Sequence, residues 1–187
     1  MNVLCLHGCG MSGLLFKKLC KPFIYKAERR NIRLIFPDAP YNDQWYHRPL
    51  EIADIGKKLP TTDIKELTEP TMLYIDMLIE MYNISALLGF SQGGNVVDTY
   101  MHIGKNRNRI KCQVVMSSYS FFCADDTTVI VPNTMIVASP EDHIVSIDET
   151  RKIPHSVSVE HSKGHKVPTT SSKVRLIVDF LEKHILS

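Results

Sequence analysis

The sequence predicts a three-layer α/β sandwich, with helices on both faces of a mostly parallel sheet of about six strands. Short apolar runs are hydrophobic at consecutive positions, as in residues 3–6, 114–116 and 135–138, which indicates strands buried on both faces. Helical segments separate these runs, and strands that alternate with helices form parallel sheets with right-handed crossovers. The chain has 187 residues without a repeat, low-complexity tract or linker, so we expect residues 1–187 to form a single domain.

Six segments are predicted as strands. Several are continuously apolar, whereas the last one alternates between polar and apolar residues, which is typical of an edge strand with one wetter face. In chain order, the predicted strands are residues 2–6, 32–36, 84–89, 112–117, 134–139 and 155–160.

The helix predicted over residues 171–186 has the clearest pattern. Its apolar residues recur at the spacing of one helix face, and Thr170 or Ser171 can cap its start. A second helix is expected over residues 93–102, ending at Gly104.

Prolines mark two further helical segments. Thr68 can cap a helix over residues 69–82, which would place Pro70 in the first turn, where a missing N–H costs little. Residues 12–30 have a helical pattern that Pro22 is expected to break or restart.

Composition and charge exclude several functional classes. The chain is 44% hydrophobic and 22% charged, as in ordinary globular proteins, and its net charge is only +2. The densest basic run, residues 105–109, is typical of a solvated loop, so we expect no nucleic-acid partner. The chain carries no sign of its oligomeric state.

Cysteine usage and the N-terminal residues bear on the compartment. The five cysteines form no C-x-x-C pair, which argues against a zinc site and favours a reduced, cytoplasmic location. Residues 1–7 lack the positive region of a signal peptide, and no apolar run approaches the length of a membrane span. We therefore expect a cytoplasmic protein with no membrane span and no bound metal.

Residues 88–94 read Leu-Gly-Phe-Ser-Gln-Gly-Gly and follow the apolar run of a predicted strand. A strand that ends in Gly-x-Ser-x-Gly and enters a helix is the nucleophile elbow of an α/β-hydrolase. The turn strains Ser91 and brings strand and helix so close that a Cβ at Gly89 or Gly93 would clash. The sequence therefore predicts Ser91 as a nucleophile at the carboxyl edge of the sheet.

A serine nucleophile needs a base and an acid, which follow it along the chain in this fold. The loop after strand 134–139 contains Glu141, Asp142 and His143. We assign Asp142 as the acid, with Glu141 as the neighbouring alternative. Asp148 is a weaker candidate because it is expected inside the next helix.

The base is expected after the last strand, where two histidines compete. We prefer His165 to His161, because Gly164 gives the backbone room to present the ring and the position lies deeper in the loop. His143 directly follows the acid and is expected to be a surface side chain.

Two backbone N–H groups are expected to bind the oxyanion. One is that of Gln92, at the start of the helix after Ser91, and the other is that of Cys9, in a glycine-rich loop over residues 7–13. His7 is expected to have a structural role. The glycines of this loop are not followed by the Gly-Lys-Ser/Thr of a phosphate-binding loop.

Residues 37–67 form an unusually long connection with four prolines and the only tryptophan. It is either a binding element at the rim of the site or a variable surface excursion. On the first interpretation, Trp45 and Tyr46 form one wall of an acyl pocket.

Taken together, these segments resemble the family of serine hydrolases typified by small fungal esterases and a human ovarian-tumour-associated hydrolase. The resemblance implies a lidless α/β-hydrolase fold, the triad Ser91, Asp142 and His165, hydrolysis of carboxylic esters or acyl thioesters, and no cofactor. Gly94 stands where the family often has alanine, which is expected to change little. Residues 41–67 are short compared with the family's pocket-forming insert, so acyl-chain preference stays open. The resemblance is carried by residues 3–8, 36–40, 45–47, 89–94 and 164–168.

The sequence therefore predicts a serine esterase or thioesterase that acts on a small-molecule acyl substrate through an acyl-enzyme intermediate. Two alternatives remain. One is a non-catalytic module that binds a ligand or a protein on the same fold, and the other is triad chemistry on an amide or carbon–carbon bond.

Overall fold

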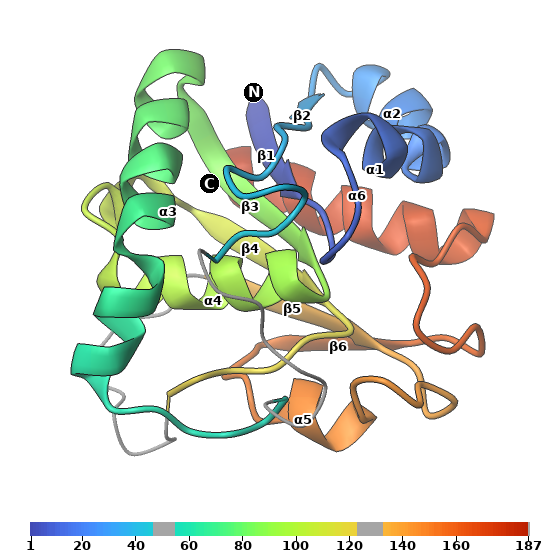
Figure 1. The fold of residues 1–187 in the computed structure, drawn as a ribbon. Coiled ribbons are helices and arrows are strands. Elements are labelled where there is room, and N and C mark those ends of the chain that lie inside the picture. The colour runs from blue at the N-terminus through green and yellow to red at the C-terminus, as the bar shows by residue number, and fades with distance from the viewer. Residues whose placement is uncertain (47–54, 123–132, 187) are drawn as a thin grey trace.

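The computed structural model of the protein describes residues 1–46, 55–122 and 133–186, and shows a six-stranded parallel sheet between two layers of helices (Figure 1). The strand order is β2-β1-β3-β4-β5-β6, and every neighbouring pair is parallel. The predicted three-layer α/β fold is confirmed, and each observed strand lies within two residues of its predicted bounds. The strands are β1 (Asn2–Leu6), β2 (Arg33–Ile35), β3 (Ile84–Phe90), β4 (Cys112–Met116), β5 (Asn133–Ala138) and β6 (Val157–Glu160).

Helices cover both faces of this sheet, as Figure 1 shows. Two separate apolar clusters result, because successive side chains of a strand point to opposite faces. In β1, Leu4 and Leu6 pack in the cluster beneath α3 and α4, whereas Val3 and Cys5 pack in the cluster beneath α1, α2 and α6. The helices are α1 (Gly13–Leu19), α2 (Lys21–Glu28), α3 (Thr61–Tyr82), α4 (Gln92–Ile103), α5 (Ile147–Arg151) and α6 (Ser171–Leu186), and a short 3₁₀ turn spans Arg107–Arg109.

The edge prediction for the last strand is also confirmed, since β6 lies at one end of the sheet. Its side chains alternate between more and less accessible positions, and only Val159 is buried. The carboxyl ends of β1, β3, β5 and β6 all open at the same edge of a parallel sheet, so the loops that follow them can meet there.

The start of α3 was predicted wrongly. Thr68 does not cap the helix: it lies inside, and its hydroxyl donates to the Ile64 carbonyl at 2.7 Å. Burial of Ile64 and Leu67 extends the helix back to Thr61, which more than offsets the hydrogen bond that Pro70 removes from its interior. The connection before α3 is correspondingly shorter than predicted, and its residues 47–54 lie outside the described part.

Pro22 acts as predicted, since the helical pattern of residues 12–30 divides into α1 and α2 with the proline in the first turn of α2. The Ser12 hydroxyl caps α1 by accepting from the Leu15 amide at 3.2 Å. Within the described residues, no helix is long and apolar enough to span a bilayer.

Candidate active site

The turn from β3 into α4 has the strained geometry that the Gly-x-Ser-x-Gly motif predicts. Ser91 has φ 54° and ψ −121°, a conformation that non-glycine residues rarely adopt. Its amide donates to the Met116 carbonyl on β4 at 2.9 Å, which holds the turn against the sheet. A Cβ at Gly93 would lie 2.5 Å from the His7 carbonyl oxygen, and one at Gly89 would lie 2.7 Å from the Gly94 Cα. Both glycines are therefore needed for the close packing of strand, helix and first loop.

Gly94 is also more constrained than the sequence suggests. A Cβ there would lie 2.7 Å from the Ser118 Cβ, so alanine would collide with this side chain. The expectation that glycine changes little at this position is wrong in this chain. Ser118 occupies the space, and its hydroxyl donates to the Ser91 carbonyl at 2.8 Å.

The three predicted triad residues lie together at the carboxyl edge of the sheet. The His165 Nε2 lies 3.0 Å from the Ser91 Oγ, and the His165 Nδ1 lies 2.8 Å from the Asp142 Oδ2. These side chains come from the loops after β3, β5 and β6, so three segments far apart in the sequence form one hydrogen-bonded chain. Such a chain can pass the proton of a serine hydroxyl to an imidazole whose tautomer a carboxylate fixes.

The Asp142 carboxylate is held rigidly. Its side chain is 1% exposed, and its Oδ1 accepts from the Ile144 and Val145 amides, each at 2.9 Å. Burial raises the pKa of this carboxyl, but the Val145 amide, the His165 ring and the Ile144 amide lower it by more, so the pKa lies below its usual value. Asp142 is therefore ionised at neutral pH and directs one oxygen at the imidazole.

The competing acids and bases lie elsewhere. Glu141, His143 and Asp148 are exposed, and Asp148 pairs with Arg151 in α5. His161 is buried, and its Nδ1 accepts from the Lys163 amide at 3.2 Å, away from Ser91.

Ser139 joins the loop after β5, which carries Asp142, to the loop after β6, which carries His165 and is called the histidine loop below. Sequence reasoning missed this role. Its buried hydroxyl accepts from the Glu141 amide at 3.2 Å and from the Gly164 amide at 3.1 Å. These two amides flank Asp142 and His165 in sequence. Gly164 has φ 62°, a left-handed conformation that glycine adopts without strain and that turns the chain toward the imidazole. In the sequence, Ser139 is only the last residue of a predicted strand, which does not indicate this role.

The two backbone amides expected to bind an oxyanion lie in the first loop and at the start of α4. Within the described residues, neither the Cys9 nor the Gln92 amide has a hydrogen-bond acceptor. Gln92 is the first residue of α4, where the helix dipole adds positive potential. The loop that carries Cys9 passes close to the nucleophile, since a Cβ on Gly8 would lie 3.3 Å from the Ser91 Cβ.

His7 has the structural role expected of it. Its Nδ1 donates to the Gly8 carbonyl at 2.8 Å, and its Nε2 accepts from the Ala39 amide at 3.0 Å. Burial lowers the pKa of this imidazole, which keeps the ring neutral. The neutral ring ties the first loop to the segment after β2.

Trp45 and Tyr46 lie in the core, with side chains that are 0% and 1% exposed. The Trp45 indole N–H donates to the His7 carbonyl at 2.8 Å, and the Trp45 amide donates to the Gln92 side-chain oxygen at 3.0 Å. The Tyr46 hydroxyl bonds to the Asn95 side chain in α4. The two rings pack against the first loop and α4, and they are too buried to form the predicted wall of an acyl pocket. His47, next to them, lies outside the described residues.

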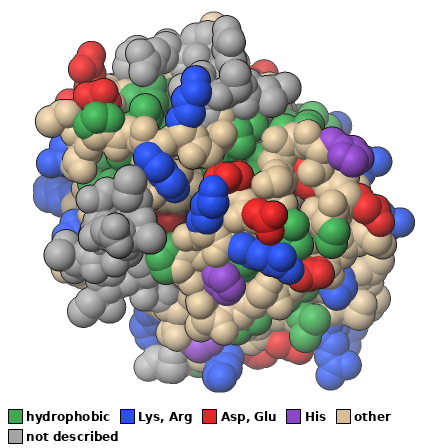
Figure 2. All heavy atoms as spheres, turned by 90° about the horizontal axis from the view of Figure 1, so that it is seen from below, with side chains coloured by type: hydrophobic (Ala, Val, Ile, Leu, Met, Phe, Trp, Pro, Cys, Tyr) green, Lys and Arg blue, Asp and Glu red, His purple; other side chains and the backbone are tan. Residues whose placement is uncertain are grey.

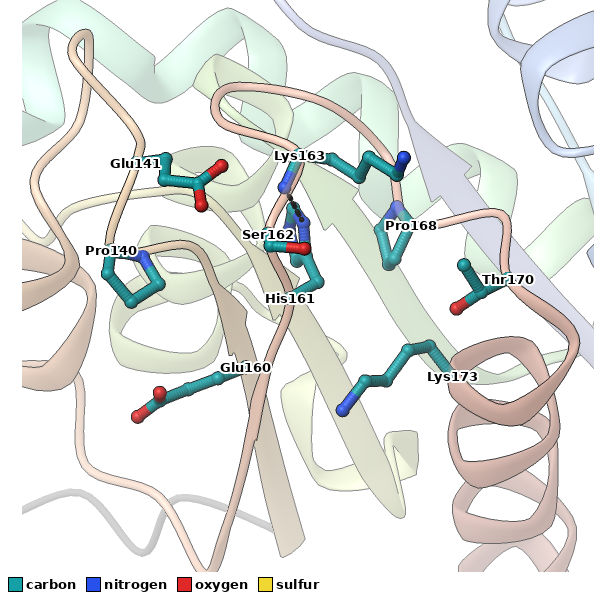
Figure 3. A pocket seen from close by; sticks show the side chains of 9 residues that line it. All are labelled: Pro140, Glu141, Glu160, His161, Ser162, Lys163, Pro168, Thr170 and Lys173. Carbon is teal, nitrogen blue, oxygen red and sulfur yellow. Dashed lines mark hydrogen bonds between the residues drawn. The ribbon is translucent and has the colours of Figure 1, made fainter.

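A cavity of about 410 Å³ lies beside the histidine loop (Figure 3). Glu141 and Lys163 stand at its loop side and Glu160 and Lys173 at its other end, so its charges are mixed. Ser91 does not line it, nor does it line a second cavity of about 360 Å³ between α3 and the end of α4. Among the described residues, no group of histidine, cysteine or acidic side chains is arranged to hold a metal ion.

Comparisons with known proteins agree with this architecture. A model of the "Serine hydrolase (FSH1)" family matches residues 1–177, and no curated protein matches the chain. SOBER1 from Arabidopsis thaliana superposes with a TM-score of 0.74 at 17% identity, over 100% of this chain and 99% of that one. The esterase PE8 superposes with a TM-score of 0.72 at 16% identity, over 98% and 92% of the chains. A monoacylglycerol lipase from Paleococcus ferrophilus superposes with a TM-score of 0.66 at 14% identity, over 98% of this chain and 94% of that one.

Proposed function

We propose that this chain, which belongs to the serine hydrolase (FSH1) family, cleaves carboxylic esters or acyl thioesters through an acyl-enzyme intermediate. The proposal rests above all on the continuous chain of hydrogen bonds from Ser91 through His165 to Asp142. An ester or thioester carbonyl is the electrophile that such a serine attacks without a metal or an organic cofactor.

In the first half of the reaction, the Ser91 oxygen attacks the acyl carbon while the His165 Nε2 takes the hydroxyl proton. Asp142 keeps the other ring nitrogen protonated and stabilises the imidazolium. The carbonyl oxygen becomes an anion between the Cys9 and Gln92 amides, which have no other acceptor among the described residues. Each correctly placed amide raises kcat by a factor of about 10²–10³.

In the second half, the tetrahedral intermediate collapses and the imidazolium gives its proton to the departing alcohol or thiol. Water, deprotonated by the same ring, then attacks the acyl-Ser91 ester and releases the carboxylic acid. Both halves use one base and one pair of amides, so Ser91, His165 and Asp142 act as a unit whose separate losses are not additive.

We also propose that the protein works as a single domain in the cytoplasm. Two apolar clusters on the faces of one sheet support the first point. Free, buried cysteines support a cytoplasmic location, where thiols stay reduced. Burial raises the pKa of the Cys20 and Cys112 thiols to about 12, so these thiols stay protonated and act as apolar core residues.

The test is the steady-state hydrolysis of p-nitrophenyl esters and acyl-coenzyme A thioesters of graded chain length. We expect wild-type protein to cleave at least one series and Ser91→Ala to lose all activity above the uncatalysed rate. Ser172→Ala, the same change at an exposed position in α6, is the matched control and should keep wild-type rates. Undetectable turnover by wild-type protein, together with binding of the esters, would favour the non-catalytic module instead.

A further inference from the structure

The exposed face of α1 carries large apolar side chains. Leu14, Leu15 and Leu19 are 63%, 44% and 41% exposed, whereas Phe16 on the opposite face is fully buried in the core. The helix is anchored by its buried side and by the Ser12 cap, so its leucines are held outward on a firm base. Protruding leucines on an anchored surface helix are typical of an interaction site.

The segment that carries these leucines is rich in positive charge. Residues 13–33 hold seven lysine or arginine residues and one acidic residue, Glu28, whereas the remainder of the chain holds 15 basic and 19 acidic residues. Over the described residues, four lysines of this segment have neither an ion-pair nor a hydrogen-bond partner, namely Lys17, Lys18, Lys21 and Lys26.

The arginines of the segment brace it. Arg30, just after α2, forms an ion pair with Asp179 and a second with Glu182 at 3.1 Å, which fastens the end of this segment to α6. Arg29 donates to the Tyr25 hydroxyl at 3.1 Å, and its guanidinium lies 5.7 Å from the centre of that ring. The lysines, in contrast, are free to meet an external anion.

Two other surfaces of the described residues lack this combination. A second row of exposed apolar residues runs along α3 through Leu73, Met77 and Met81, but this helix also carries the acidic residues Glu69 and Glu80. On the face seen in Figure 2, basic and acidic side chains are interspersed and hydrophobic ones form only small groups. Among these surfaces, α1–α2 alone pairs apolar residues with an excess of positive charge.

A short loop joins α1 to the candidate active site. α1 begins four residues after Cys9, whose amide faces the proposed oxyanion position, and Figure 1 shows the helix rising directly from that loop. Gly13 closes the turn so tightly that a Cβ there would lie 2.5 Å from the Phe36 carbonyl oxygen. α1 is therefore held close to the segment that follows β2, and a short loop connects it to the candidate site.

We propose that the α1–α2 surface docks the protein on an anionic lipid bilayer. Leu14, Leu15 and Leu19 would enter the headgroup boundary while the four lysines pair with lipid phosphates and carboxylates. Lipid fits better than nucleic acid, because three exposed leucines gain nothing from a polar phosphate backbone but gain from acyl chains. The docking is peripheral, and it does not depend on the proposed hydrolysis.

The test is co-sedimentation of the full chain with vesicles of phosphatidylcholine, with and without about one third phosphatidylserine. We expect binding to the anionic vesicles only, and weaker binding as salt rises, because screening shortens the reach of the lysine charges. The triple variant Lys17→Glu, Lys18→Glu, Lys21→Glu should bind at least about 100-fold more weakly, since each lysine contributes about fivefold. Leu14→Gln with Leu19→Gln should also weaken binding at unchanged charge.

The matched control is Lys65→Glu, Lys105→Glu, Lys183→Glu, which changes net charge equally at exposed lysines elsewhere and should bind nearly as wild type does. Circular dichroism spectra and melting temperatures should be unchanged in both triple variants, which shows that they fold. No binding by wild-type protein, equal losses in the two triple variants, or binding to RNA in preference to vesicles would overturn the proposal. None of these outcomes would affect the proposed triad.

Discussion

Replacing Asp142 by asparagine should disable the site without changing its shape. The Asp142 Oδ1 accepts from two amides at 2.9 Å, so an asparagine must keep its carbonyl oxygen there. Its NH₂ group then takes the position of Oδ2, 2.8 Å from the His165 Nδ1. Because the NH₂ can only donate, Nδ1 must accept and the ring proton moves to Nε2, where it blocks transfer from Ser91.

The magnitude follows from this tautomer change. A ring that presents N–H to Ser91 cannot act as a base, and we expect kcat to fall by about 10³–10⁴ at neutral pH. KM should change little, because Asp142 contacts no substrate. The free energy of unfolding should fall by about 1–2 kcal/mol, the difference between a charged and a neutral acceptor for two buried amides.

The stability change should also depend on pH. The folded-state pKa of Asp142 lies below its usual value, so the carboxylate stabilises the folded protein at pH values above about 3.9. This contribution is lost as pH falls below that value and through the lower folded-state pKa. Urea unfolding of wild type and Asp142→Asn should therefore show a gap at pH 7 that closes in acid.

The assay is steady-state hydrolysis of a p-nitrophenyl ester across pH. Glu141→Gln and Asp148→Asn remove the neighbouring carboxylates by the same chemical change and should keep wild-type kcat. Wild-type turnover in Asp142→Asn, or a loss of similar size in Glu141→Gln, would refute this reasoning.

Three further changes should have different signatures. Gly93→Ala should lower the free energy of unfolding by about 3 kcal/mol or prevent folding, because its Cβ would lie 2.5 Å from a backbone oxygen. Gly10→Ala has open space around it and should lower this free energy by only about 1 kcal/mol, because of its positive φ. Equal midpoints of urea unfolding for the two variants would contradict this. Trp45→Phe should cost about 1–3 kcal/mol, since it leaves the buried His7 carbonyl without its indole donor; an unchanged melting temperature would exclude such a role. Ser139→Ala should lower kcat about tenfold or more with little change in KM, because a displaced catalytic group lowers the rate of the chemical step. Ser139→Thr keeps a hydroxyl and should restore part of the lost kcat. A rise in KM alone would argue against a role of Ser139 in positioning the triad.

Much of the fold could be predicted because its determinants are local. The strands are continuously apolar segments between helices, and the alternation in β6 identified it as an edge. The start of α3 could not be predicted in the same way. Its first turns are stabilised by burial of Ile64 and Leu67 against the rest of the molecule, and Pro70 suggests a helix start when the sequence is considered alone.

The candidate site divides in the same way. Ser91 lies in a local motif, and the acid and base follow from chain order in the fold, so three loops could be matched before their distances were known. The support beneath them depends on tertiary contacts. Nothing near Ser139 in sequence indicates that it bonds to Gly164. The two sequence interpretations of residues 37–67, a binding element and a surface excursion, did not include the buried position that Trp45 has.

The most direct measurement of the central claim is to locate the covalent adduct of a fluorophosphonate by digestion and mass spectrometry. We expect one adduct, on Ser91, formed quickly in wild-type protein and at least about 10³-fold more slowly in His165→Ala, since the serine hydroxyl would lose its base. An adduct on Cys9 or another serine, or labelling of Ser91 at the wild-type rate without the imidazole, would contradict a nucleophile activated by His165.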